Sequence, residues 1–310
     1  MSMKVLKKIV FNSVFLLGGF LFAFGQQDPL YTQYMYNTNQ INPAYAGSRG
    51  TLSIYGQYRA QWVGLDGAPK TANISVTTPL GQNGLGLGVN FTNDRLGAMD
   101  ENTISFDLSY AVDLNQDYKL AFGLKGSMNI LNIDYTKLDV HSMPPGGLHN
   151  IDNRFNGNVG AGLYLYSDKT YVGFSVPMFL ENKMYNDNEY STMKQKLHYY
   201  LIGGHVFDLN PNLRFKPAFL MKAVSGAPVQ VDLTANFMIA EKVELGAAYR
   251  WDASVSALAG FQVNESIFIG YSYDFETNDL KHYNSGSHEV FLRFDLFSNR
   301  FIKVSPTRFF

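Results

Sequence analysis

The histidines are the side chains best suited to acid–base or metal chemistry, but their spacing does not assemble a site. The six are His141, His149, His198, His205, His282 and His288. His198 and His205 lie seven positions apart, so in an extended segment their side chains point to opposite faces. Without a bulge they cannot bind one metal ion together. His141, His149 and His282 fall in expected loops. We therefore predict no metal site.

Three further patterns could carry chemistry, and each has a simpler interpretation. His288 lies near Ser285 and Ser287, the closest approach to the Ser–His pair that a hydrolase needs, but these residues resemble a loop-to-strand junction. Residues 186–189 (Asn-Asp-Asn-Glu) offer oxygen ligands that suit Ca²⁺, and a solvated loop tip explains them equally. The glycine-rich residues 81–88 lack the lysine and the helix of a phosphate-binding loop. We predict no catalytic residue and no cofactor.

Charged residues occur instead at alternate positions of otherwise apolar segments. In residues 102–113, the even positions from 104 to 112 hold Ile, Phe, Leu, Tyr and Val, whereas the odd positions from 103 to 111 hold Thr, Ser, Asp, Ser and Ala. A β-strand sends neighbouring side chains to opposite faces, so one face is apolar and the other polar. Thirteen charged residues share the polar parity of such segments: Arg59, Asp107, Lys125, Arg214, Lys216, Lys222, Asp232, Glu244, Arg250, Asp274, Glu289, Arg293 and Asp295.

The alternating segments predict an all-β protein with about fourteen strands. Each is close to the roughly 9–11 residues that a tilted strand needs to cross a bilayer. The expected strands are 51–62, 70–80, 84–93, 102–113, 118–131, 154–167, 169–178, 197–208, 212–224, 229–240, 242–251, 254–263, 265–275 and 287–297. Pro217 falls inside one of them and predicts a bulge or a local error in that strand, because proline removes a ladder donor.

The two faces favour a transmembrane antiparallel β-barrel over a soluble β-sandwich. A sandwich would leave its outward positions polar, whereas here they hold rows of Leu, Phe and Tyr, as in residues 85–91 and 120–128. A charge facing lipid costs roughly 2–4 kcal/mol, so the charged parity must face the lumen. Both signs occur there, which predicts a hydrogen-bonded network and not a channel of one charge.

The lengths of the connections support a barrel in an outer membrane. Such barrels have short periplasmic turns and longer outer loops. The even-numbered connections are tight, and the first, third, fifth, seventh and thirteenth are expected to be long, above all 132–153 and 179–196. The ninth and eleventh are short as well, against the rule. An even number of strands predicts that both termini lie in the periplasm of a diderm bacterium.

The N-terminal residues 1–25 read as a cleaved signal peptide. Three lysines precede an apolar run, and Ala23 and Gly25 supply small residues before Gln26. Cleavage would leave 22 Lys and Arg against 26 Asp and Glu, so no basic excess suggests a nucleic-acid partner. Because there is no cysteine, we expect neither a lipid-modified cysteine nor a disulfide.

The rest of the chain divides into three expected parts. Residues 26–50 form an N-terminal segment, rich in Tyr, Asn and Gln, that we interpret as a leader, a periplasmic lid or a plug. Residues 51–297 form the barrel, and residues 298–310 form a tail.

Both ends of the mature chain resemble the PorP/SprF family of type IX secretion system membrane proteins. The opening motif includes Gln33 and Tyr34, then Asn42, Pro43, Ala44 and Gly47, and the tail contributes Pro306 and Arg308. The resemblance implies a non-catalytic outer-membrane component of protein secretion or gliding motility. It implies, as partners, the C-terminal domain of a large exported protein such as a surface adhesin. It also implies periplasmic secretion-ring proteins or a peptidoglycan-binding lipoprotein.

The outer loops are the expected cargo-binding surface. Several apolar and aromatic residues in one loop are what a protein interface needs. The candidates are Leu138, Met143, Phe179, Met184, Tyr185 and Tyr190. Two alternatives remain open. One is an outer-membrane channel or a transporter of small hydrophobic solutes, because a barrel of this size can hold an open lumen. The other is an outer-membrane hydrolase.

Overall fold

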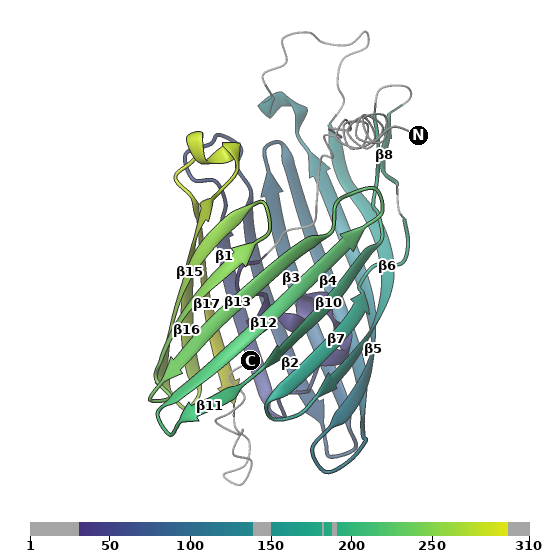
Figure 1. The fold of residues 1–310 in the computed structure, drawn as a ribbon. Coiled ribbons are helices and arrows are strands. Elements are labelled where there is room, and N and C mark those ends of the chain that lie inside the picture. The colour runs from purple at the N-terminus through teal and green to yellow at the C-terminus, as the bar shows by residue number, and fades with distance from the viewer. Residues whose placement is uncertain (1–30, 139–149, 182, 188–190, 297–310) are drawn as a thin grey trace, which may run out of the picture.

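A computed structural model describes residues 31–138, 150–181, 183–187 and 191–296. It contains a closed antiparallel barrel of fourteen strands, which confirms the predicted fold class (Figure 1). The barrel strands are β1 (Leu52–Ala60), β2 (Lys70–Leu80), β3 (Leu85–Leu96), β4 (Met99–Asp113), β5 (Lys119–Ile133), β6 (Ile151–Tyr166), β7 (Thr170–Val176), β10 (His198–His205) with β11 (Phe207–Asn210), β12 (Leu213–Val224), β13 (Gln230–Ile239), β14 (Val243–Arg250), β15 (Ser254–Asn264), β16 (Ile267–Glu276) and β17 (Ser287–Leu296).

The barrel closes between its first and last strands, because β1 pairs with β17 from Leu52–Leu296 to Ala60–His288. Both β10 and β11 pair with β12, so they act as one strand that is interrupted at Val206. A separate two-stranded hairpin, β8 (Lys183–Asp187) and β9 (Ser191–Lys194), stands beside the barrel in the seventh connection. Within the described residues, no helix has the length and apolar character to cross a membrane.

Alternation along each strand produces the two faces. The outward positions of β3 to β6 are apolar and exposed; Phe106, Leu124 and Val159, for example, each expose at least half of their surface. The inward positions are polar or aromatic and buried. Hydrocarbon is therefore the natural solvent of the outer face, and the protein core lies inside the barrel.

The connections are unequal at the two ends of the barrel. We call the end with the connections β1–β2, β5–β6, β7–β10 and β16–β17 the loop end, and the opposite end the turn end (Figure 1). The third connection, expected to be long, is only the two-residue turn Gly97–Ala98. Residues 93–102 do not form a loop but continue β3 and β4 as a paired ribbon.

Pro217 does not bulge its own strand, because β12 keeps an unbroken register with β13 around the Pro217–Ala235 pair. On its other side, the β10 pairing ends at Ala218 and the β11 pairing resumes at Phe215. The missing N–H of the proline thus coincides with the break between β10 and β11, so the irregularity lies in the neighbouring strand.

Candidate functional site

The lumen is filled by residues 31–50, which we call the inner segment. It contains three short helices, η1 (Tyr34–Tyr36), α2 (Thr38–Ile41) and η2 (Pro43–Tyr45). Sixteen of its twenty residues are buried. It begins near the loop end, where Thr32 meets Glu289, and finishes at the turn end, where Thr51 Oγ1 donates to the Leu296 carbonyl. The lumen of the barrel is therefore occupied by the protein's own chain.

A buried ion cluster holds the start of the inner segment. Arg59 lies 2.6 Å from Asp274 and 3.0 Å from Glu289. The backbone N–H groups of Thr32 and Gln33 donate to the two oxygens of Glu289, at 3.0 and 2.9 Å. The Thr32 hydroxyl donates to Asp274 at 2.7 Å. Backbone donors that would otherwise be unsatisfied in the lumen thus have charged acceptors.

A second group of contacts holds Arg49 and Tyr36 of the inner segment in the half of the lumen nearer the turn end. Arg49 forms an ion pair with Asp295 at 2.8 Å. The Tyr36 hydroxyl donates to Glu244, and the Lys216 ammonium lies 4.5 Å from the centre of the Tyr36 ring. The cation–π contact and the hydrogen bond place one phenol between a cation and an anion.

The middle of the inner segment contacts the wall formed by β3, β4 and β5. Lys125 is 2.8 Å from Asp107 and also donates to the Asn39 carbonyl at 3.3 Å. The Asn39 side-chain amide donates to Asp107 at 3.0 Å and to Asn90 at 3.1 Å. One strand-to-strand ion pair therefore also binds the inner segment.

Eight of the thirteen charged residues predicted to face the lumen fall into separate groups. Arg250 and Asp232 pair at 3.0 Å near the loop end. Arg214 lies at the rim of the turn end, 2.7 Å from Glu241. The other five are placed by the clusters above: Arg59 at Glu289, Asp107 with Lys125, and Lys216 with Glu244 around Tyr36.

The opening motif lies along the inner segment. The Tyr34 hydroxyl is 3.3 Å from Thr234, and the Asn42 side chain accepts from the N–H of Ala44 and donates to the Leu163 carbonyl. Pro43 begins η2, a position where proline's missing N–H costs nothing. The motif thus shapes the segment, whereas Pro306 and Arg308 lie outside the described residues.

Glycines of the barrel wall make room for this motif. A Cβ atom on Gly123 of β5 would lie 2.1 Å from the Ala44 nitrogen. Gly47, at φ +72°, lies against Gly86 of β3. The wall and the inner segment are therefore closer together here than any side chain would allow.

The expected cargo residues are only partly placed. Leu138 and Phe179 are exposed in connections of the loop end. Met184 and Tyr185 belong to β8, whose backbone alone is described, and Met143 and Tyr190 lie outside the described residues. His288 and Ser287, the residues closest to a Ser–His pair in the sequence, have other partners. His288 Nδ1 is hydrogen-bonded to the Tyr271 hydroxyl at 2.6 Å, and the Ser287 hydroxyl accepts from the backbone N–H of Trp62. In the described part of the chain no three His, Cys, Asp or Glu side chains gather as metal ligands would.

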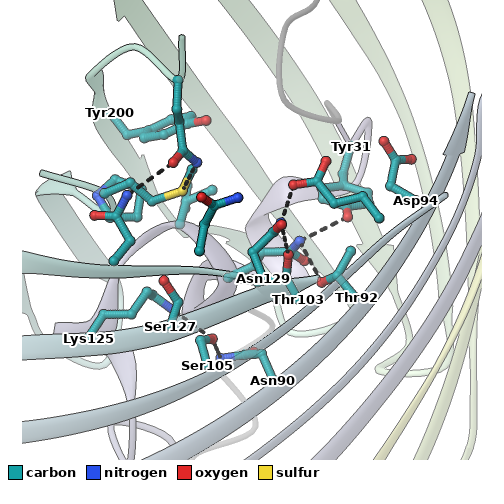
Figure 2. A pocket seen from close by; sticks show the side chains of 18 residues that line it. Tyr31, Asn90, Thr92, Asp94, Thr103, Ser105, Lys125, Ser127, Asn129 and Tyr200 are labelled. Atoms are coloured by element: carbon teal, nitrogen blue, oxygen red, sulfur yellow. Dashed lines mark hydrogen bonds between the residues drawn. The ribbon is translucent and has the colours of Figure 1, made fainter. Parts of the chain in front are cut away.

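A cavity that was not predicted from the sequence lies beside the inner segment (Figure 2). It lies in the half of the lumen nearer the loop end, and Asn, Thr and Ser residues of β3 to β6 form its wall. The Gln40 amide bridges Tyr31 at 2.9 Å and Thr92 at 3.2 Å across its margin. Small polar residues at every second position of these strands could have indicated the cavity. The wall of any barrel lumen contains such residues, however, so they do not distinguish a cavity from a filled lumen.

The family model described as "Type IX secretion system membrane protein PorP/SprF" matches residues 23–294. The chain belongs to the PorP/SprF family. It is therefore an outer-membrane β-barrel of type IX secretion, a family that works with secretion machinery and exported cargo in general. Membership and fold favour a secretion or channel role over a catalytic one. No protein among the curated sequences matches this PorP/SprF chain.

Several solved structures are similar to this PorP/SprF chain. A NanC porin matches with a TM-score of 0.43 and 11% identity, covering 79% of this chain and 100% of the porin. The CymD monoaromatic hydrocarbon channel matches at 0.48 and 11%, covering 88% and 95%. The P. putida toluene transporter TodX matches at 0.47 and 8%, covering 84% and 92%.

Proposed function

We propose that this protein is a non-catalytic scaffold that holds a large exported protein, through its C-terminal domain, at the cell surface. The observation that supports this role best is the filled lumen. The inner segment has sixteen buried residues. Asn39, Tyr36 and Thr32 bond it to three strands on different sides of the barrel, β5, β14 and β17. A lumen tied in this way suits a rigid anchor better than a pore.

The proposed orientation follows from the two ends of the barrel. Short turns of outer-membrane barrels lie in the periplasm, so the turn end faces the periplasm and the loop end faces outward. The end of β17 then lies on the periplasmic side, from which the tail 298–310 would reach secretion-ring or lipoprotein partners. Tyr31 and Thr32, in contrast, lie in the outward half of the lumen. We therefore propose a periplasmic C-terminus, but no periplasmic position for the start of the inner segment.

The proposed cargo surface is formed by the fifth and seventh connections. They carry the exposed apolar residues Leu138, Phe179 and Leu180, the last two at 43% and 48% exposure. Exposed apolar side chains in outer loops suit a protein partner.

This proposal is tested by replacing residues 138–149 with a short Gly–Ser turn, which leaves β5 and β6 intact. We expect normal barrel insertion but loss of the exported protein from the surface, measured by antibody binding on intact cells. The matched control replaces residues 225–228 of the β12–β13 connection and should retain surface display. Unchanged display in the first variant would contradict the cargo surface.

The alternative function, an outer-membrane channel, makes a different prediction. Purified protein in a planar bilayer should give no stable open pore if the inner segment stays in place. A steady ohmic conductance of the unmodified barrel would favour the channel over the scaffold.

A further inference from the structure

Three hydrogen-bond donors lie together on the outward face of neighbouring strands near the loop end. They are Tyr58 of β1, Lys70 of β2 and Arg95 of β3. Lys70 is paired with Arg95 in the β2–β3 ladder, and Tyr58 is paired with Ala72, two positions along β2 from Lys70. Opposed Cβ atoms of an antiparallel ladder are about 4.5–5.5 Å apart, and diagonal neighbours about 7–8 Å. The three side chains can therefore reach one common ligand.

The depth of this group in the membrane follows from the outward residues of the same strands. Ile74 on β2 and Phe91 on β3 lie two outward positions from Lys70 and Arg95, and both are exposed on the face that contacts hydrocarbon. Lys70 and Arg95 thus lie where the apolar band ends. Long basic side chains at such a border lay their stems on apolar surface and extend their charges to the headgroups, and tyrosine is enriched at the same depth.

The two cations are not neutralised by the protein. Like charges in directly opposed positions destabilise a ladder. In the described part of the chain Lys70 takes part in no ion pair, and the one acidic partner of Arg95 is Asp100, 3.1 Å from its Nε atom. Asp100 offsets one of the two positive charges, so the group keeps an excess. An anion bound between Lys70 and Arg95 would remove their repulsion.

The unused donors of the group suit a phosphate. Within the described residues, neither the terminal nitrogens of Arg95 nor the Tyr58 hydroxyl has a hydrogen-bond partner. A phosphate group presents several strong acceptor oxygens. Arginine binds such a group through parallel N–H donors, and lysine binds it as a point charge. At the border of the apolar band, the phosphates within reach are those of lipid headgroups.

We propose that Tyr58, Lys70 and Arg95 bind the phosphate of an anionic lipid in the outer leaflet. Lys70 and Arg95 hold the phosphate between them, the Tyr58 hydroxyl donates to it, and the acyl chains lie along the apolar outward residues of β2 and β3. The leaflet follows from the proposed orientation of the loop end. The binding itself depends only on the barrel and not on the cargo role, because cargo display and lipid binding are measured separately.

The test uses the whole mature barrel in a neutral maltoside detergent, with bound lipid counted by native mass spectrometry. The probes are phosphatidic acid and the diacylglycerol with the same chains, which lacks the phosphate. We expect phosphatidic acid to bind more tightly by roughly tenfold or more, since each basic residue adds attraction for an anionic lipid. Replacing both Lys70→Gln and Arg95→Gln should remove this preference and leave the binding of diacylglycerol unchanged.

The matched control replaces both Lys137→Gln and Lys281→Gln. These lysines are exposed in connections of the loop end, so this variant loses the same charge but keeps the group at the border. It should bind phosphatidic acid like the unmodified protein. Lys70→Arg, which keeps the positive charge, should do so as well. The heat-dependent mobility of every variant on gels reports folding.

Three results would overturn the proposal. The first is equal binding of phosphatidic acid and diacylglycerol by the unmodified barrel. The second is an equal loss of binding in the two folded double variants, which would reflect net charge and not this site. The third is displacement of phosphatidic acid by an equal concentration of inorganic phosphate, which would assign the group to a free anion.

Discussion

The carboxylate of Glu289 binds both the barrel wall and the inner segment. It accepts from two backbone N–H groups of the segment and from Arg59, and it is fully buried. Removing one partner of a buried ion pair costs about 3–5 kcal/mol, because the other charge is left uncompensated. We expect Glu289→Ala to lower the free energy of unfolding by this amount.

The measurement is urea unfolding of the barrel in detergent, followed by tryptophan fluorescence. Glu241→Ala is the control, since Glu241 forms an exposed ion pair with Arg214 and should contribute less than about 1 kcal/mol. Equal effects of the two substitutions would show that the cluster at Glu289 does not hold the segment.

Gly123 tests the close approach of the inner segment to the wall. An added methyl group would collide with the Ala44 backbone nitrogen at 2.1 Å. Overpacking of this kind costs about 1–3 kcal/mol, so in Gly123→Ala the segment should be displaced and cut faster by added protease. Gly126→Ala, three residues along β5, has open space around its Cβ and should be unchanged. Protection of the segment in both variants would contradict the contact.

At the scale of the element, the alternation of apolar and polar side chains correctly predicted which segments form strands. A bilayer requires apolar residues at every second position of a barrel strand, so the pattern is strong, and each predicted strand end lies within three residues of the observed end. The errors occurred where this requirement is absent. Residues 93–102 lack the regular alternation and continue as a paired ribbon. The break at Val206 follows from a proline on the next strand.

Partners within the lumen could not be predicted from the same pattern. The odd or even position of a residue in a strand predicts which face its side chain occupies, but not which residue it contacts. Thr32, for example, contacts Glu289, which is 257 positions away in the sequence. The inner segment has neither strand nor helix periodicity, so its short helices depend on contacts with the wall. The cavity depends on where that segment stops filling the lumen, which no local signal encodes.

The outward face of β5 allows a depth test of the membrane position. Leu124 is 63% exposed in the middle of the apolar band, whereas Asn132 has the same outward parity near the loop end of the strand. A lysine near the bilayer midplane costs roughly 2–4 kcal/mol, and close to zero at the interface. We expect Leu124→Lys to reduce folding into lipid vesicles and Asn132→Lys to leave it unchanged. Similar folding of both variants would show that Leu124 does not lie near the middle of the hydrocarbon core.

At the scale of the whole molecule, the direction of the inner segment has a consequence for orientation. The chain runs from the ion cluster at Glu289 near the loop end to the Arg49–Asp295 pair at the turn end before β1 begins. If the turn end is periplasmic, the start of the segment lies in the outward half of the barrel. A buried segment that crosses the lumen in this direction must be enclosed while the barrel closes, because β17 supplies acceptors for both of its ends.

The absence of cysteine from the chain makes this orientation directly measurable. A single cysteine at Tyr283, which is 69% exposed in the β16–β17 connection, should react with a membrane-impermeant maleimide on intact cells. A cysteine at Asp117, exposed in the β4–β5 turn, should react only after the outer membrane is permeabilised. The opposite pattern would invert the barrel, move the cargo surface and the cavity to the periplasm, and make the tail the surface-exposed end.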